Sequence, residues 1–490
     1  FRRGLSAFQG TTNDYSSGLG MNLYLVLLVG YAALLVGLGV GIGRRTRQAA
    51  DFFVAGRRLG PGLLFATMLA ANIGAGSTVG ATGLGYRDGI AAWWWVGSTA
   101  IGTAVLAFWV GPALRRASQR LDLHTVGDYL EHRYGLTVRA VAAVILGLAS
   151  LAILAGQLIA LAWVLDVTAG VPKTLGCLIG GLVVTGYFSA GGLSASVWVN
   201  LAQLTVKLVG LGIAVPFAVR EAGGWPGSWS VLPADAGYWG FWQNAGSGWP
   251  LLMLLGPAFA VSPGLLQKVY GARDDAAARR GAGATALALL LYAWVPPFLG
   301  ILARSRFPDL ASPELALPML LRHAVPPAVG GLGLAAVFSA EMSAADAVLF
   351  MLSTSIAQDL YRRFFNPDAS DARLLAAARL TAYLSGGAAI ALAIMLPNVI
   401  GALSVFYTLL TVSLFVPILG GLLSRGAGTA EALAAIALGL AGALAVHLAT
   451  SGPGQGALTP AGVGTLAAAA GFIATRLLRS QRAMRPSRIS

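Results

Sequence analysis

Charged residues are scarce in this sequence, and their scarcity excludes an ordinary water-soluble protein. Asp, Glu, Lys and Arg make up 11% of the 490 residues, while 57% of the residues are hydrophobic. A soluble domain carries roughly 25% charged residues. The polar side chains are too few to cover a water-exposed surface, so we expect a protein embedded in a membrane.

Cysteine and histidine are also rare, which removes much of the chemistry of metal sites and enzymes. The single cysteine, Cys177, cannot pair within one chain and is expected to be a small buried hydrophobe. The four histidines are scattered, and neither an HExxH pair nor a phosphate-binding GxxxxGKS or GxxxxGKT loop occurs. We therefore expect neither an enzyme nor an ATP-driven pump, and no organic cofactor.

Long apolar segments are abundant. A helix that crosses a bilayer needs about 20 apolar residues. Segments of this kind lie at 22–43, 61–85, 90–113, 138–168, 171–189, 195–218, 249–270, 281–303, 328–357, 374–396, 399–423, 428–449 and 458–478. The sequence thus predicts an all-α membrane protein of about 13 transmembrane helices, with one domain at 21–478. A polar extension at 1–20 would precede this domain, and a tail at 479–490 would follow it.

The basic residues gather in alternate loops, and this predicts the orientation of the chain. The Arg-rich set of loops covers 44–58, 115–139, 268–280, 362–379, Arg425 and 476–488. Basic residues mark cytoplasmic loops, so the N-terminus would lie outside and the C-terminus inside, in a bacterial inner membrane. The net charge of +14 is then a topology signal, and no nucleic-acid partner is expected.

Two of the segments contain residues that interrupt helices. Residues 72–80 read NIGAGSTVG, and the seventh segment contains Gly256-Pro257 and Ser262-Pro263-Gly264. Gly weakens a helix, and Pro also removes a backbone donor. Each interruption alone is compatible with close helix packing or a simple kink.

The spacing of these two segments carries more information than either one. They lie five segments apart, and a repeat of five crossings is necessarily inverted in its second copy. Paired interruptions in inverted halves are the sequence mark of a transport site at the bilayer midplane. We expect the repeats at 61–218 and 249–423, with one extra helix at 22–43 and two at 428–478.

Five stretches are similar to the sodium:solute symporter family. They are AANIGAGSTVGATGLGY (70–86), DLHTVGDYLEHRYG (122–135), GGLSASVWVNLAQ (191–203), PGLLQKVYGARDDAAARR (263–280) and MSAADAVLFMLSTSIAQDLYRR (342–363). The resemblance implies the inverted five-plus-five fold that is also seen in bacterial leucine transporters. It further implies a secondary active transporter that carries a small polar organic solute by alternating access, with sodium as the default coupling cation.

The resemblance also implies a sodium site, which this sequence matches incompletely. Its ligands would be the backbone carbonyls of Ala70, Ile73 and Ala340 and hydroxyls at positions 343 and 344. Ser343 supplies a hydroxyl, whereas Ala344 does not. Many members have an acid on the sodium release path where this chain has Asn200. Both departures weaken the case for a sodium site of the usual kind.

A lysine in the middle of segment 195–218, Lys207, suggests an alternative. A charge at bilayer depth costs roughly 2.5–3.5 kcal/mol, so it needs a partner or a role. Lys207 lies two helical turns beyond Asn200, on the same face. It could replace the sodium ion as a fixed or protonatable cation, in a proton-coupled or sodium-independent transporter. Asp346 would be its natural partner, with Glu341 pointing nearly opposite, and a static Lys207–Asp346 pair is the structural alternative.

Polar groups beside the two interruptions are the predicted solute contacts. The set consists of Asn72, Gly74, Ser77, Thr78 and Ser262. Unwound backbone at a helix N-terminus can also hold a carboxylate. Sugar carriers of the family tend to have Gln where Ser77 stands, so a sugar is disfavoured. The expected partners are the solute and the lipid bilayer, with no obligatory protein partner, and a transporter-like receptor is a distant alternative.

Overall fold

The computed structural model describes residues 24–34, 37, 59–221, 237–244, 246–424, 426–452 and 454–484, and nearly all of them are helical. The expected extension at 1–20, the ends of segment 22–43, residues 222–236 of the loop before α12 and the last six residues lie outside the described residues. A short antiparallel pair, β1 (Gln243–Asn244) and β2 (Ser247–Gly248), completes the described structure.

The helical elements follow the predicted segments closely. In chain order they are α4 (Pro61–Asn72), η3 (Gly76–Gly80), α5 (Ala81–Asp88), η4 (Gly89–Ala92), α6 (Trp93–Val105), η5 (Leu106–Val110), α7 (Gly111–Leu121), α8 (Val126–Tyr134), α9 (Leu136–Ala169), α10 (Lys173–Glu221), α12 (Leu251–Ala260), α13 (Pro263–Tyr270), α14 (Asp275–Tyr292), α15 (Val295–Arg306), η7 (Pro313–Leu315), α16 (Ala316–His323), α17 (Pro327–Thr354), η8 (Ser355–Phe365), α18 (Asp371–Met395), α19 (Val399–Leu410), η9 (Thr411–Phe415), α20 (Val416–Leu423), α21 (Thr429–Thr450) and α22 (Pro460–Met484).

Ten helices within the described ranges are long and apolar enough to cross a membrane, and three shorter apolar helices accompany them, at Tyr24–Leu34, Pro61–Asn72 and Lys173–Gly186. The all-α membrane class is therefore confirmed, whereas the count of thirteen crossings and the bounds of the repeats stay predictions. One boundary differs: the segments expected at 171–189 and 195–218 run together as α10. Gly191 and Gly192 weaken a helix, but no proline stands between the two segments to end it.

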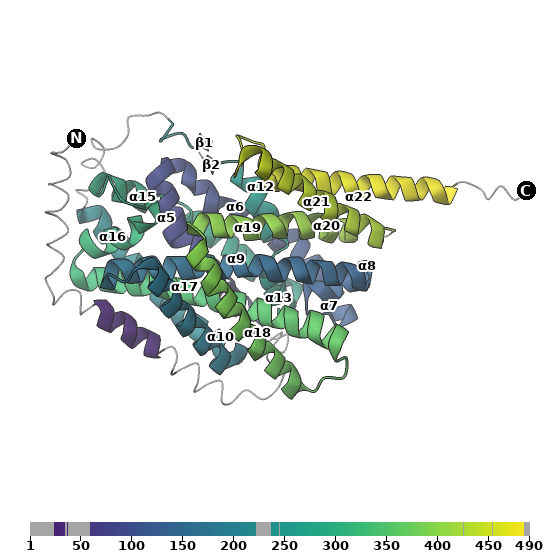
Figure 1. Ribbon diagram of the computed structural model, residues 1–490, viewed down its shortest axis with the longest axis horizontal. Coiled ribbons are helices and arrows are strands. Elements are labelled where there is room, and N and C mark those ends of the chain that lie inside the picture. The colour runs from purple at the N-terminus through teal and green to yellow at the C-terminus, as the bar shows by residue number, and fades with distance from the viewer. Residues whose placement is uncertain are drawn as a thin grey trace, which may run out of the picture.

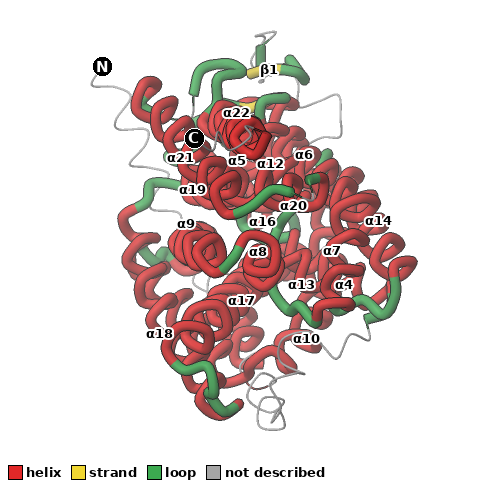
Figure 2. Tube along the Cα trace, turned by 90° about the vertical axis from the view of Figure 1, so that its right-hand side faces the viewer, coloured by secondary structure: helices red, strands yellow, loops and turns green. Residues whose placement is uncertain are grey.

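The helices form one bundle whose long axis is horizontal in Figure 1 and points toward the viewer in Figure 2. The ends of α7, α8 and α20 lie at one end of the bundle, and α5, α15 and α16 lie at the other (Figure 1). The described parts of three Arg-rich loops, 115–139, 268–280 and 362–379, also lie together in space, because ion pairs join them.

Ion pairs tie the helices at this Arg-rich end. Arg115 Nε lies 2.7 Å from Asp275 Oδ1, and Arg139 lies 2.6 Å from Glu131 Oε2. Glu131 also pairs with Arg363. Burial raises the pKa of the Glu131 carboxyl, but hydrogen bonds from the two arginines outweigh burial, and the net pKa lies below its usual value. These carboxylates therefore stay charged and hold the loops together.

The first predicted interruption lies between α4 and η3. The helix ends at Asn72, and Ile73 adopts an extended conformation, with φ −92° and ψ 95°. Three residues, 73–75, thus separate the two helical pieces. The backbone groups released there are available to side chains and solutes.

The second interruption lies between α12 and α13, at Val261 and Ser262, whose ψ of 120° turns the chain before Pro263. Gly256-Pro257 does not break its helix, contrary to expectation, because both residues lie inside α12. The close contact with α6 depends on Gly102, where an added Cβ would lie 2.3 Å from the Gly256 carbonyl oxygen.

The first broken segment packs along a second interrupted helix. Its first half, α4, packs on α14, and its second half, α5, packs on α15. A Cβ on Gly281 of α14 would lie 2.9 Å from Leu64 Cβ of α4. On the other side of the break, a Cβ on Gly85 of α5 would lie 2.5 Å from Pro297 Cα of α15. The pairs α4–α14 and α5–α15 are therefore in backbone contact, with the chain turning at Ala293 and Trp294 between α14 and α15.

Candidate functional site

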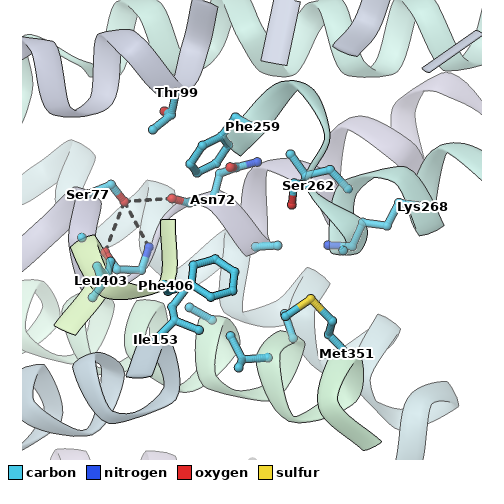
Figure 3. Close-up of a pocket in the computed structure, with 18 of the residues that line it drawn as sticks. Asn72, Ser77, Thr99, Ile153, Phe259, Ser262, Lys268, Met351, Leu403 and Phe406 are labelled. Atoms are coloured by element: carbon cyan, nitrogen blue, oxygen red, sulfur yellow. Dashed lines mark hydrogen bonds between the residues drawn. The ribbon is translucent and has the colours of Figure 1, made fainter. Parts of the chain in front are cut away.

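A cavity of about 180 Å³ lies between the two interruptions. Figure 3 shows Asn72 and Ser77 of the first broken segment across from Ser262 and Lys268 of the second, with Phe406 and Met351 on the wall between them. The remaining wall comes from α6, α9, α12, α17 and α19, including Trp95, Thr99, Gln157, Phe259, Ala344, Leu403 and Tyr407. The structure thus brings together Asn72, Gly74, Ser77 and Ser262 of the predicted solute contacts.

Side chains satisfy the backbone groups that the first interruption releases. The Ser77 hydroxyl donates to the Asn72 carbonyl (2.9 Å) and accepts from the Gly74 N–H (3.1 Å). Gln157 Oε1 on α9 accepts from the Ala75 N–H at 2.9 Å. Tyr292 donates to the Ser77 carbonyl at 3.0 Å. A break inside a bilayer must be buried in protein or line a cavity, and this one does both.

Thr78, the fifth predicted solute contact, faces another helix instead of the cavity. Its Oγ1 lies 2.9 Å from the Gly74 carbonyl oxygen and 2.6 Å from Oε1 of Glu341. The Glu341 side chain is fully buried on α17. Thr78 therefore joins the first broken segment to α17.

Lys207 lies beside the first interruption and is completely buried, with 0% exposure. Its Nζ donates to the carbonyls of Ala70, at 2.8 Å, and Ile73, at 3.0 Å. These are two of the three carbonyls that the family resemblance assigns to sodium. The Ser343 hydroxyl donates to the same Ala70 carbonyl at 3.4 Å.

The other two residues of the implied sodium site lie against the same break. A Cβ on Gly74 would be 2.4 Å from Ala344 Cβ and 3.7 Å from the Ala340 carbonyl oxygen. The structure therefore brings all five implied ligand positions together. In the described part of the chain, no group of three or more His, Cys, Asp or Glu side chains could hold a metal, so sodium would depend on carbonyl and hydroxyl oxygens.

The acidic partners of the buried lysines differ from expectation. Glu341, rather than Asp346, is the described acid whose charge acts on Lys207. Asp346 acts on a second lysine, Lys268 of α13, whose Nζ donates to the Thr67 carbonyl at 2.8 Å. The expected Lys207–Asp346 pairing came from helical spacing on α17. Spacing along one helix cannot show that the chain turns between α4 and η3, which places Thr78 against Glu341. Asn200 lies in α10, but its side chain is outside the described residues.

Aromatic and acidic contacts join the helices at the end opposite the Arg-rich one. Phe241 of the loop before α12 stacks on Trp294, and Trp94 Nε1 donates to the Phe241 carbonyl at 2.9 Å. Glu314 in η7 accepts from Trp163 Nε1 (2.9 Å) and from the Val399 N–H at the start of α19 (2.6 Å). Burial raises the pKa of the Glu314 carboxyl above its usual value, and these hydrogen bonds oppose the effect only in part.

The cavity residues that were not among the predicted contacts include Gln157, Trp95 and Lys268. Gln157 and Trp95 stand alone in apolar segments, without a spacing that marks them. Lys268 was assigned to the start of a cytoplasmic run, yet its side chain is half-buried and lines the cavity. The sequence signal for Lys268 was its place five residues after the Ser262-Pro263 break, which puts it one turn or so into the second half-helix.

Comparisons with known proteins agree with this geometry. The model of the sodium:solute symporter family matches residues 52–439. The sodium/pantothenate symporter of Escherichia coli (strain K12) is 28% identical over 367 residues, which cover 70% of this chain and 73% of the relative. The sodium/glucose cotransporter of Vibrio parahaemolyticus is 24% identical over 402 residues, 72% of each chain. The human high affinity choline transporter 1 is 24% identical over 457 residues, with 85% and 75% covered.

Two solved structures have the same fold. A Na+-coupled sialic acid symporter in a substrate-bound, outward-open state has a TM-score of 0.75 at 19% identity, and the match covers 93% of this chain and 97% of the other. Mhp1, a nucleobase-cation-symport-1 family transporter in a closed conformation, has a TM-score of 0.60 at 17% identity, covering 88% and 95%.

Proposed function

The chain belongs to the sodium:solute symporter family, and from this premise we propose that it is a secondary active transporter in which the Lys207 ammonium takes the place of the sodium ion. The family and its relatives support cation-coupled symport. In our proposal the solute is small, polar and organic, the coupling cation is the proton, and the protein works in a bacterial inner membrane with its N-terminus outside.

The contacts of Lys207 Nζ carry this proposal. An ammonium that donates to the Ala70 and Ile73 carbonyls uses the oxygens that a sodium ion would need. Two positive charges 4 Å apart repel each other by about 4 kcal/mol at an effective dielectric constant of 20. A sodium ion would therefore have to displace the Lys207 side chain, which is fully enclosed.

The surroundings of Ala344 support the same conclusion. This position offers a methyl group where the implied site has a hydroxyl, and the methyl group packs against Gly74. The Ser343 hydroxyl, which donates to Ala70, is then the one hydroxyl left of the two that the resemblance implies. The position therefore supplies one oxygen fewer than the implied sodium site.

Transport into liposomes under imposed ion gradients tests the proposal. Purified protein is reconstituted, and uptake of a panel of labelled solutes is measured with an inward Na+ gradient, an inward proton gradient or neither. We expect uptake that needs no Na+ and rises with the proton gradient. Uptake that requires Na+ would instead favour the family default of sodium symport. The oxygens of Ala70, Ile73, Ala340 and Ser343, which lie close together, are the observation in favour of that alternative.

The Lys207→Met variant separates coupling from mere structure. If Lys207 is a static link between helices, the variant will keep the ion dependence of the original protein at a lower protein yield. If Lys207 replaces the ion, the ion dependence itself will change.

A further inference from the structure

We propose that the transported solute is a small organic carboxylate, whose charged group binds the side-chain N–H donors of Gln157 and Trp95 beside the first interruption. This inference rests on the proposed transport function, since it assigns the solute class to the same cavity. It follows from three features of the cavity wall: its donors, its charge and its aromatic surface.

The orientation of the Gln157 amide is fixed by the backbone. The Ala75 N–H can only donate, so the amide atom that faces it at 2.9 Å is the oxygen. The Nε2 hydrogens must then point elsewhere, and Gln157 is a lining residue of the cavity. Because no described group accepts from Nε2, its two hydrogens are available to a solute.

Trp95 supplies a second donor on the same side. Its Nε1 lies 3.1 Å from the position that a Cβ on Gly76 would occupy, and the corresponding distance from Gln157 Oε1 to a Cβ on Gly74 is 3.0 Å. The indole and the amide therefore flank the same short stretch, 74–76. An indole N–H donates and never accepts, so both groups favour a solute oxygen.

The charge of the described wall favours an anion over a cation. Lys268 is the one charged side chain among the described lining residues, and it is half-buried with its surface toward the cavity. Asp346 attracts Lys268 from α17, but it is buried and does not line the cavity. A quaternary ammonium solute would face a lysine without a lining carboxylate to balance its own charge. An anion would be attracted.

The remaining wall is aromatic and apolar. The rings of Phe259 and Tyr407 lie 5.3 Å apart, and those of Phe406 and Tyr407 lie 5.1 Å apart. Together with Ile153 they offer an apolar surface for the body of the solute. A carboxylate on a compact hydrocarbon body matches both parts of this wall.

Binding to the purified full-length protein in detergent tests the solute class. Matched probes would be butyrate, lactate and benzoate, their uncharged amides, the corresponding amines, and choline, each measured by thermal shift with and without NaCl. We expect at least one carboxylate to bind at least tenfold more tightly than its amide, with no binding of amines or choline. Failure of every carboxylate, or equal binding of acid and amide, overturns the inference.

Two variants test the assigned donors. Gln157→Glu keeps an oxygen for the Ala75 N–H but replaces the donor with a negative oxygen, so we expect carboxylate binding to fall at least 100-fold. Trp95→Phe removes one N–H and keeps an aromatic ring, so we expect carboxylate binding to weaken about tenfold. This second variant keeps the inference testable if Gln157→Glu fails to fold. Unchanged carboxylate binding in either folded variant contradicts the assignment.

The two proposals fail in distinguishable ways. Carboxylate binding that appears only with NaCl would refute the replacement of sodium by Lys207 and leave the solute class standing. Proton-driven, Na+-independent uptake of an amine or amide would refute the solute class and leave the replacement of sodium by Lys207 standing.

Discussion

The two buried lysines of this protein have the same chemistry but lie in different surroundings. Lys268 donates to the Thr67 carbonyl of α4, and Lys207 donates to the Ala70 carbonyl of α4 and to the Ile73 carbonyl just after it; each is attracted by an acid on α17. Lys207 is fully enclosed beside the interruption, whereas Lys268 is half-buried and faces the cavity. The difference shows how one residue type can serve as a built-in ion in one place and as a solute contact in another.

The largest expected effect comes from removing the enclosed lysine. Lys207→Met removes the ammonium from two buried carbonyls. The Ala70 carbonyl keeps the Ser343 hydroxyl as a donor, whereas the Ile73 carbonyl loses its donor at a cost of about 1–3 kcal/mol, and we expect transport to fall at least ~100-fold. Uptake into liposomes, with the thermal unfolding midpoint measured in parallel, checks this. Lys268→Met is the matched control, since it removes the same charge from the Thr67 carbonyl of α4, and equal losses in both variants would erase the distinction between the two lysines.

A double variant should turn the enclosed site into an ion site. Lys207→Ala removes the ammonium, and Ala344→Ser adds the missing hydroxyl beside Ser343 and the Ala340 carbonyl. We expect uptake that is restored in part by Na+, by about tenfold over its absence. The single Ala344→Ser variant is the control and should gain no response to Na+, because Lys207 still uses the carbonyls. A Na+ response in that single variant would show that the ammonium does not block the site.

The cavity-facing lysine should control affinity more than ion dependence. We expect Lys268→Met to weaken carboxylate binding by about tenfold, equivalent to about 1.4 kcal/mol, because one attractive charge leaves the wall. Lys268→Arg should bind within a few-fold of the original protein, whereas Lys207→Arg should not transport, since no free space surrounds its side chain. Thermal shift with the same probes provides the measurement, and a tolerated Lys207→Arg would contradict the contrast in burial.

The smallest effect is expected at Glu314, at the end of the bundle opposite the Arg-rich one. Burial raises the pKa of Glu314 above its ordinary value of 4.5, so its contribution to stability is full at low pH, where the carboxyl is neutral, and is lost as pH rises through the folded-state pKa. The unfolding midpoint of the original protein should therefore fall by a few degrees relative to Glu314→Gln as pH increases from 4 to neutral. A difference that does not change with pH would show that Glu314 keeps one protonation state.

The general architecture could be predicted from the sequence because the bilayer leaves few solutions. Apolar segment length and the placement of arginines predicted an all-α membrane bundle, and glycines at 74 and 76 predicted the first interruption. The second interruption was ambiguous, since proline occurs at both 257 and 263, and only helix packing decides which proline ends the helix. Gly102 of α6 packs directly on the Gly256 carbonyl oxygen, and Gly256-Pro257 stays inside α12.

The site could be predicted less completely. The oxygens around Lys207 were expected from the family resemblance, but the acid facing each lysine was not, because spacing along α17 says nothing about how α4 turns after Asn72. Gln157 and Trp95 carry no local pattern at all. Their role appears only when α6 and α9 lie beside the released backbone of residues 74–76.

The glycine contacts between α4 and α14 and between α5 and α15 have a mechanical consequence. An added Cβ at Gly281 or Gly85 would collide with the facing helix, so the two helices of each pair cannot come closer together. The turns at 73–75 and 293–294 both join the pair α4–α14 to the pair α5–α15. A relative rotation of the two pairs would therefore bend both turns together, and a solute seated at 74–76 would lie at one of them.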